Sequence, residues 1–149
     1  MSFTRLRYHI VFTTKEREPW LTREVEEFVY PVVGRIAKLN RGCLLCIGGV
    51  EDHVHLLVAI SPTMAVAEFV RAIKASSSAA IRKKFSSLRG FRWQGEYSCF
   101  TVWPKDYKGL VRYIENQKEH HRQRTTRDDY EVMVSDKGPE PLARGEGRS

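Results

Sequence analysis

Residues 49–58 read Gly-Val-Glu-Asp-His-Val-His-Leu-Leu-Val, with two histidines separated by one apolar residue in a run that has the composition of a β-strand. Side chains at positions i and i+2 of a strand point to the same face, so we expect His53 and His55 to project together while Val54 turns into the core. Paired imidazoles are suitable metal ligands, but two ligands do not complete a metal site. The rest of the chain must therefore supply a third.

The segments around this stretch predict a small sheet. Residues 43–49 and 54–60 have the pattern of two antiparallel strands joined by a short turn. Residues 5–14 are rich in aromatic and β-branched side chains and predict an earlier strand, and residues 98–103 predict a fourth.

Three other segments have helical periodicity. The first covers residues 22–39, and Pro31 within it should kink or split the helix, because proline lacks a backbone donor and crowds the preceding turn. The second covers residues 61–85. The third starts at Pro104 and ends in the region 118–127.

This order of elements predicts an α+β fold. A ferredoxin-like antiparallel sheet of about four strands, with helices packed on one face, accommodates it. We expect one domain over residues 1–134. Residues 135–149 are rich in glycine, proline and charge, and we expect them to form a flexible tail.

Composition limits the classes of protein that the chain can belong to. Its 149 residues are 42% hydrophobic and 29% charged, which is typical of one soluble globular domain. No apolar run approaches the ~20 residues of a membrane span, and three cysteines fit a reducing compartment. We therefore expect a cytoplasmic protein with no membrane partner. Its net charge of +7 favours an anionic partner, with nucleic acid the first candidate.

Two segments are candidates for contact with nucleic acid. Arg71, Lys74 and Arg82 follow one side of the second helix. The loop 91–97 mixes aromatic residues, among them Trp93, with a basic residue, Arg92. Such surfaces can stack unpaired bases and neutralise phosphates. The alternative is that the basic side is simply solvated and that some of the rings belong to the core.

A candidate nucleophile lies far along the chain. Tyr113 and Gln117 are four residues apart on the predicted third helix, so they share a face. A phenol with a pKa near ~10 becomes a useful nucleophile only beside a cation or a base. His53, His55 and the amide oxygen of Gln117 could hold such a cation and leave positions open for phosphate oxygens. Mg²⁺ or Mn²⁺ is the preferred ion, and Zn²⁺ stays open.

Three further side chains have two interpretations each. His120 and His121 follow Tyr113 by about two turns. They could support the metal or bind phosphate, but histidines at a helix end more often complement the helix dipole at the surface. Asp52 could orient an imidazole or only shape the turn before His53.

Three blocks of the chain, in this order, resemble the HUH-type single-strand tyrosine transposases of bacterial insertion sequences, a family that includes the repeat-associated tyrosine transposases. The blocks are residues 8–15 (Tyr-His-Ile-Val-Phe-Thr-Thr-Lys), residues 48–57 around the two histidines, and residues 112–117 (Arg-Tyr-Ile-Glu-Asn-Gln) followed by His120 and His121. The resemblance covers roughly residues 5–125. It differs at Gly95-Glu96-Tyr97, where similar members have the order Glu-Gly-Tyr, and in the carboxy-terminal segment.

The resemblance implies a mechanism and partners. By similarity, His53, His55 and Gln117 would hold the metal, and Tyr113 would cut single-stranded DNA to leave a 5′-phosphotyrosine and a free 3′-hydroxyl. The family also implies a homodimer and imperfect DNA hairpins as recognition elements. The main alternative is a domesticated, non-catalytic protein that binds hairpin DNA or RNA as a regulator.

Overall fold

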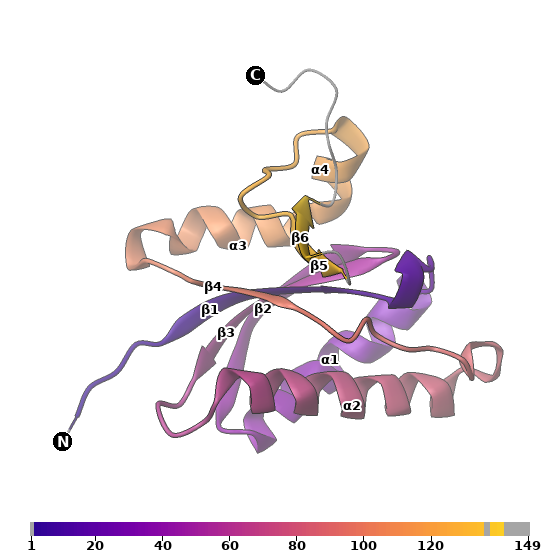
Figure 1. The fold of residues 1–149 in the computed structure, drawn as a ribbon, viewed down its shortest axis with the longest axis horizontal. Coiled ribbons are helices and arrows are strands. Elements are labelled where there is room, and N and C mark those ends of the chain that lie inside the picture. The colour runs from indigo at the N-terminus through magenta and orange to yellow at the C-terminus, as the bar shows by residue number, and fades with distance from the viewer. Residues whose placement is uncertain (1, 136–137, 142–149) are drawn as a thin grey trace.

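The computed structural model describes residues 2–135 and 138–141, and side-chain surroundings as far as residue 131. Its centre is a four-stranded antiparallel sheet in the order β2-β3-β1-β4 (Figure 1). The strands are β1 (Arg7–Thr13), β2 (Gly42–Val50), β3 (His53–Ile60) and β4 (Ser98–Thr101). All four of the strands predicted from the sequence are present, and β3 lies at an inner position between β2 and β1.

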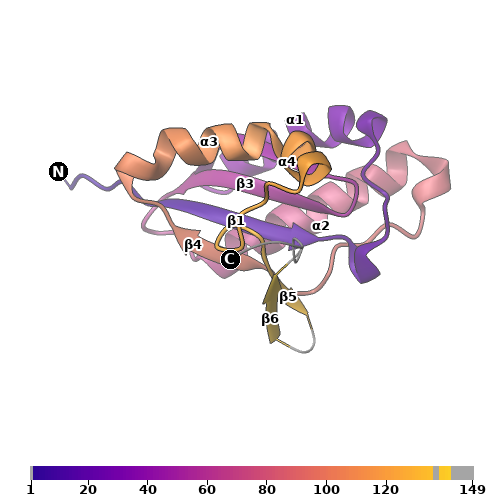
Figure 2. The same ribbon diagram turned by 90° about the horizontal axis from the view of Figure 1, so that it is seen from above.

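Helices lie on both sides of this sheet. Helices α1 (Arg23–Leu39) and α2 (Val66–Lys84) lie below it in Figure 1, whereas α3 (Tyr107–Glu115) and α4 (Gln117–Gln123) lie above it. Figure 2 shows the same arrangement from above, with α3 and α4 in front of the strands. Short 3-10 helices occupy Lys15–Arg17, Ser86–Leu88 and Pro104–Asp106.

One face of the sheet carries the larger core. Alternate residues of β1 and β3, such as Phe12 and Leu56, pack there against the apolar sides of α1 and α2. Thr22 caps α1, and its side-chain oxygen accepts a hydrogen bond from the backbone N–H of Val25 at 3.4 Å. This layer is the α+β sandwich that the sequence predicts.

The opposite face has a second, smaller core, and this corrects the expectation that the helices pack on one face only. Leu57 and Cys46 on the sheet pack there against Leu110 and Ile114 of α3. The physical reason is visible in β3, whose residues are buried on both faces apart from Ala59. A strand that is apolar on both sides needs a cover on both sides.

A glycine lets α3 come close to the sheet. A Cβ atom on Gly48 would lie 2.1 Å from the carbonyl oxygen of Ile114, so no larger residue fits without a shift of the helix. This close approach brings the carboxy-terminal end of α3 against β2, next to the strand that carries the histidines.

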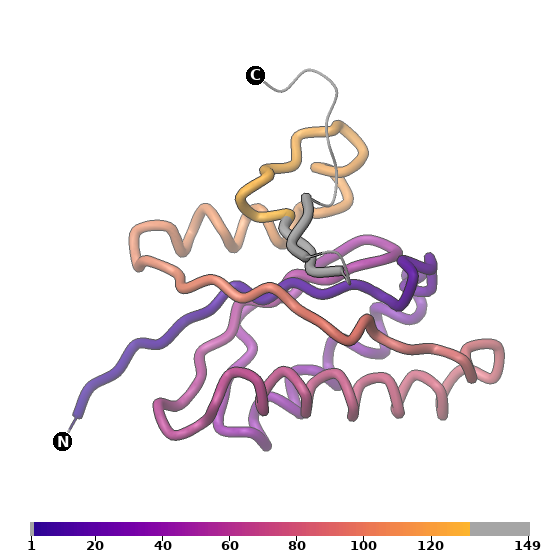
Figure 3. Tube along the Cα trace, in the orientation of Figure 1, coloured from indigo at the N-terminus to yellow at the C-terminus, as the bar shows by residue number. Residues whose placement is uncertain are grey.

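Two helix predictions can be compared with the structure. Helix α1 is one continuous helix through Pro31, so the proline does not split it, and a kink at this position stays a prediction. The predicted third helix, by contrast, is divided into α3 and α4 at Asn116, whose φ and ψ of −105° and 26° are not helical. The path of the chain through this break can be followed in Figure 3.

The carboxy-terminal region contains a short two-stranded sheet. Strand β5 (Val132–Ser135) pairs antiparallel with β6 (Gly138–Pro141). Of the segment 135–149, for which a flexible tail is predicted, residues 136–137 and 142–149 lie outside the described residues. The proposed boundary of the domain near residue 134 stays a prediction.

Among the described residues, no helix combines the length and the apolar character that a bilayer crossing requires.

Candidate metal and tyrosine site

The two histidines of β3 lie together on the face that α3 covers. His53 pairs with Val50 of β2 and Thr13 of β1. The imidazoles of His53 and His55 are both fully buried. Their ring centroids are 5.3 Å apart. The spacing of the sequence therefore places the pair as predicted, on one face, while Val54 enters the opposite core.

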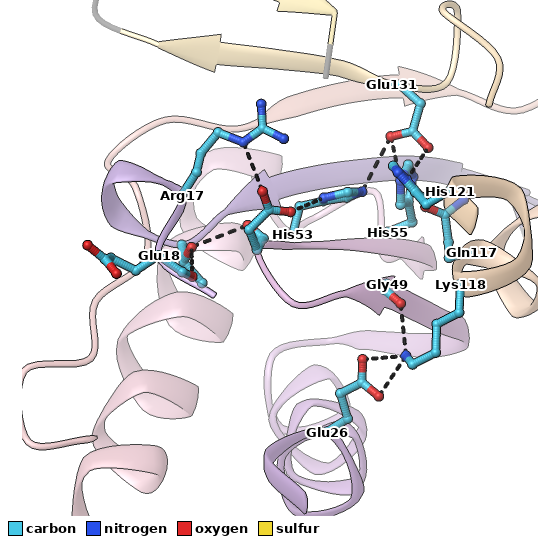
Figure 4. Close-up of polar contacts among 12 residues, drawn as sticks. Arg17, Glu18, Glu26, Gly49, His53, His55, Gln117, Lys118, His121 and Glu131 are labelled. Atoms are coloured by element: carbon cyan, nitrogen blue, oxygen red, sulfur yellow. Dashed lines mark hydrogen bonds and ion pairs between the residues drawn. The ribbon is translucent and has the colours of Figure 1, made fainter. Parts of the chain in front are cut away.

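The carboxylate of Asp52 holds the ring of His53. Nδ1 of His53 lies 2.7 Å from Asp52 Oδ1, and Arg17 Nε donates to the other carboxylate oxygen at 3.1 Å (Figure 4). Nε2 of His53 is buried and makes no hydrogen bond with a described residue. A buried nitrogen without a partner is costly unless something binds it, and a divalent cation is the ligand that a neutral imidazole suits best.

Glu131 connects the groups of the site. One of its oxygens, Oε2, lies 3.0 Å from His55 Nε2 and 3.5 Å from His53 Nε2 (Figure 4). The other, Oε1, lies 2.7 Å from the Tyr113 hydroxyl and 3.2 Å from His121 Nε2. Burial alone would raise the pKa of this carboxyl, but the hydrogen bonds from His121 and His55 and the nearby ring of His53 outweigh burial and lower it, so Glu131 is a carboxylate.

The atoms of this cluster fit a metal ion. The ligand atoms offered by His53, His55 and Glu131 all lie within 4.8 Å of one another. Two imidazole nitrogens and a carboxylate oxygen form a donor set used for transition metals and Zn²⁺. The orphaned Nε2 of His53 points to the same conclusion, because nothing else among the described residues satisfies it.

Tyr113 is close to this cluster. It is 4% exposed, it donates its hydroxyl hydrogen to Glu131, and its oxygen accepts a hydrogen bond from the backbone N–H of Arg127 at 3.0 Å. Burial and the adjacent carboxylate of Glu131 raise the pKa of Tyr113 well above its usual range. The hydroxyl is therefore a neutral phenol in this arrangement, and it needs added positive charge to become a nucleophile.

Gln117 is the first residue of α4, and it reaches the histidine pair only through His121 and Glu131. It is 1% exposed, and its amide nitrogen donates to the backbone oxygen of Tyr113 at 3.2 Å. Its Oε1 lies 3.2 Å from Nε2 of His121, which in turn contacts Glu131. The sequence therefore places Gln117 at the site, and whether it ligates the metal stays a prediction.

The two histidines of α4 also belong to the site. His121 lies with its ring 4.8 Å from that of His53, and His120 stacks on the ring of Tyr113 at 4.5 Å. These contacts indicate that His120 and His121 support the site and are not only surface residues that complement the helix dipole.

An ion pair ties the start of α4 to the opposite layer. Lys118 Nζ lies 2.6 Å and 2.8 Å from the two carboxylate oxygens of Glu26 on α1, and it donates to the carbonyl oxygen of Gly49 at 3.0 Å (Figure 4). Glu26 is 6% exposed, and Tyr30 also donates to it. This network fixes the residue next to Gln117 against the end of β2.

The candidate nucleic-acid residues gather in a groove on the other side of the sheet, which we name the α2 groove. It has a volume of about 500 Å³. Its lining includes all five residues that the sequence indicates, namely Arg71, Lys74, Arg82, Arg92 and Trp93. Their contact with DNA stays a prediction.

Three of these residues are also part of the local structure. Arg82 donates to the carbonyl oxygen of Phe91 at 3.0 Å. The ring of Trp93 packs edge-on against Phe12, and its Nε1 donates to Ser77 Oγ at 2.9 Å, so most of the ring belongs to the core. Lys74 donates to the carbonyl oxygen of Glu96, and burial lowers the pKa of its ammonium group to about 8. Arg71 and Arg92, which are exposed, are the better placed to meet phosphate.

Sequence reasoning missed Glu131 entirely. It lies in the segment Tyr-Glu-Val, which has no helical or strand period, and a glutamate in such a segment is normally solvated. The burial of Glu131 results from the packing of this segment against the sheet, so no local pattern in the sequence predicts it.

Comparisons with known proteins indicate the family of the chain. The model of the family described as "Transposase IS200 like" matches residues 2–117. The ISDra2 transposase TnpA of Deinococcus radiodurans is 28% identical over 120 residues, which cover 77% of this chain and 86% of that protein. The transposase for insertion sequence element IS200 of Salmonella typhimurium is 29% identical over 121 residues, covering 78% and 79%.

Solved structures are also similar. A putative transposase from Deinococcus radiodurans superposes with a TM-score of 0.66 at 30% identity, covering 78% of this chain and 93% of that chain. A REP-associated tyrosine transposase bound to a REP hairpin has a TM-score of 0.62, covering 81% and 72%, and at 14% identity it supports the fold alone. The family match extends over most of the sheet, both histidines and Tyr113, and the chain therefore belongs to the IS200-like transposase family.

Proposed function

We propose that this transposase nicks and rejoins single-stranded DNA at hairpin-flanked sites through a 5′-phosphotyrosine intermediate, and that the reaction depends on a divalent cation. The observation that carries the proposal is the position of Glu131, whose carboxylate joins the Tyr113 hydroxyl to both imidazoles of β3. A nucleophile and a metal-ligand set that share one buried carboxylate form a single reaction centre.

His53, His55 and Glu131 would hold the cation, and Gln117 is close enough to contribute or to position His121. A bound cation would supply positive charge beside the phosphate and stabilise the charge that develops during attack. Mg²⁺ or Mn²⁺ is proposed, with Mn²⁺ favoured by the two nitrogen donors and Zn²⁺ still open.

The residues of the chain then carry out the exchange of bonds. The oxygen of Tyr113 forms a bond to phosphorus, and the bond from phosphorus to the 3′ oxygen breaks with its electron pair on that oxygen. The phenol proton leaves along the hydrogen bond to Glu131 and is returned to the 3′ oxygen. Because the phosphotyrosine keeps the energy of the broken phosphodiester, the reverse attack can rejoin a strand.

The DNA partner follows from charge and from similarity. The net charge of +7 and the arginines of the α2 groove suit a phosphate backbone. The similar REP-associated transposase is bound to a hairpin, which supports a hairpin partner for this chain as well. A homodimer belongs to the same proposal, and analytical ultracentrifugation would measure it.

A covalent-adduct assay tests the proposal. The protein is incubated with Mn²⁺ and a pool of single-stranded DNA hairpins, and adducts that resist denaturation are mapped by mass spectrometry. We expect an adduct on Tyr113 that is lost in Tyr113→Phe and on removal of the metal. Tyr107→Phe is the matched control, because Tyr107 lies on the same helix under the guanidinium of Arg7. Hairpin binding without any adduct would replace the proposed transposition with regulation.

A further inference from the structure

His9 lies directly behind the metal site, on β1, and is 2% exposed. Its Nε2 is 2.9 Å from Nδ1 of His55, on the side of the imidazole that faces away from Glu131. The two rings are stacked, with centroids 5.1 Å apart and planes at 19°. No other pair of rings described around the site combines stacking with a ring-to-ring hydrogen bond.

The neighbours of His55 determine which atoms donate. The carboxylate of Glu131 can only accept, so Nε2 of His55 carries a proton and donates to it at 3.0 Å. Burial keeps His55 neutral, and its other nitrogen, Nδ1, is then an acceptor. His9 must therefore donate from Nε2. Burial and the neighbouring His55 lower the pKa of His9 to about 3, so His9 is also a neutral imidazole.

A cation at this site requires the opposite arrangement. Metal ligation by Nε2 of His55 needs the lone pair of that nitrogen, so the proton of the neutral ring must be on Nδ1. His9 must then accept from His55 across the same 2.9 Å contact in which it donates when His55 is hydrogen-bonded to Glu131. A neutral imidazole can do both by moving its single proton from Nε2 to Nδ1, and the pair keeps its two protons throughout.

We infer that His9 is a positioning residue of the metal site, which presents the Nε2 lone pair of His55 by exchanging the donor and acceptor ends of their shared hydrogen bond. This inference rests on the proposed metal-dependent function. It also distinguishes the two proposed ligands. The Nδ1 atom of His53 faces a carboxylate, Asp52, which can only accept, whereas Nδ1 of His55 faces His9, which can donate or accept.

The competing explanation is packing. His9 also contacts the rings of Phe100 and Tyr130, with centroids 6.1 Å and 5.5 Å away, so it could serve only to fill this part of the core. A phenylalanine would fill the same place and stack on His55, but it has no nitrogen with which to exchange a hydrogen bond. Glutamine has the opposite properties, since its amide can accept or donate but cannot stack as a ring.

Calorimetric titration of the full chain with Mn²⁺ separates these explanations. We expect His9→Phe to bind Mn²⁺ about 10- to 100-fold more weakly than the wild type, the usual effect of losing a hydrogen-bond partner behind a ligand. We expect His9→Gln to restore most of the affinity. Phe100→Leu is the control, because it disturbs the same ring cluster and leaves the His9–His55 hydrogen bond in place.

Each result has a defined meaning. Wild-type affinity in His9→Phe, or an equal loss in His9→Phe and His9→Gln, would overturn the inference and leave packing as the explanation. If the wild type itself binds no Mn²⁺, Mg²⁺ or Zn²⁺, the proposed metal dependence fails instead.

A second measurement avoids the risk that a variant does not fold. In wild-type protein labelled with ¹⁵N-histidine, long-range ¹H–¹⁵N spectra report which ring nitrogen carries the proton. On addition of Mg²⁺ or Zn²⁺, which are diamagnetic, we expect the proton of His55 and that of His9 both to move from Nε2 to Nδ1. A His9 ring whose proton stays on Nε2 while the metal binds would contradict the inference.

Discussion

The two metal-ligand candidates have different groups behind them, and this difference controls their protonation. His53 is backed by the carboxylate of Asp52, whereas His55 is backed by the neutral ring of His9. Burial by itself lowers the pKa of both histidines. At His53 the hydrogen bond to Asp52 and the charges of Asp52 and Glu131 outweigh burial and raise the pKa above its usual value, but at His55 burial prevails.

Metal binding should therefore weaken in mild acid, with His53 as the group that titrates. A proton on its Nε2 competes with the cation, so affinity for Mn²⁺ should fall by up to about tenfold per pH unit below the raised pKa of His53. In Asp52→Asn the charge that raises this pKa is absent, and the midpoint should move to lower pH. Titrations with Mn²⁺ between pH 5.5 and 8.5 would measure it.

The control for this experiment is Glu27→Gln, which removes one carboxylate from an exposed pair with Arg23 on α1. It should leave the midpoint where it is in the wild type. An unshifted midpoint in Asp52→Asn would assign the titration to another group of the site.

Residue-level chemistry was readable from the sequence where it depends on local spacing. The i and i+2 rule places His53 and His55 on one face, and the four-residue separation places Gln117 near Tyr113. Glu131 could not be predicted, because its burial depends on where a segment without periodicity returns to the sheet. The same applies to His9, whose contact with His55 joins two paired strands that are far apart in the sequence.

At the level of elements, the position of α3 decides whether Tyr113 reaches the histidines. The helix rests on β2 at Gly48, and the ion pair of Lys118 with Glu26 fixes the chain just after the break at Asn116. The helical period predicted the existence of this segment. It did not predict the break, because Asn116 is not a strong helix breaker and the dihedral angles there follow from docking on the sheet.

Substitution at Gly48 tests this docking. A Cβ in Gly48→Ala would meet the backbone of Ile114, which can move only with the helix, so we expect a loss of about 1–3 kcal/mol in the free energy of unfolding. The yield of the Tyr113 adduct should fall further than stability alone explains, because α3 carries the proposed nucleophile. Urea unfolding and the adduct assay measure the two effects.

Gly109→Ala is the matched control on the same helix. A Cβ there has no atom within 4 Å, and alanine should stabilise the helix by about 0.5–1 kcal/mol. If Gly48→Ala unfolds like Gly109→Ala and forms the adduct normally, the close contact of α3 with β2 does not position Tyr113.

In the whole molecule, the proposed reaction centre and the α2 groove lie on opposite faces of the sheet. Tyr113 and the histidines are on the side of α3 and α4, whereas the groove follows α2 on the side of the larger core. Figure 1 shows these helices on opposite sides of the sheet. A DNA that uses both must pass around an edge of the sheet. The two surfaces should then be separable, one governing affinity and the other the chemical step.

Salt dependence tests this division. Arg71 is exposed on α2 at the lining of the groove. If it neutralises one phosphate, Arg71→Ala should weaken hairpin binding and reduce the slope of log K against log[salt] by about one. The rate of adduct formation at saturating DNA should stay at the wild-type value, because the reaction centre is on the other face. Arg35→Ala, on the exposed side of α1, should change neither quantity. An unchanged slope in Arg71→Ala, or a slower adduct step at saturation, would show that the hairpin does not use the α2 groove in this way.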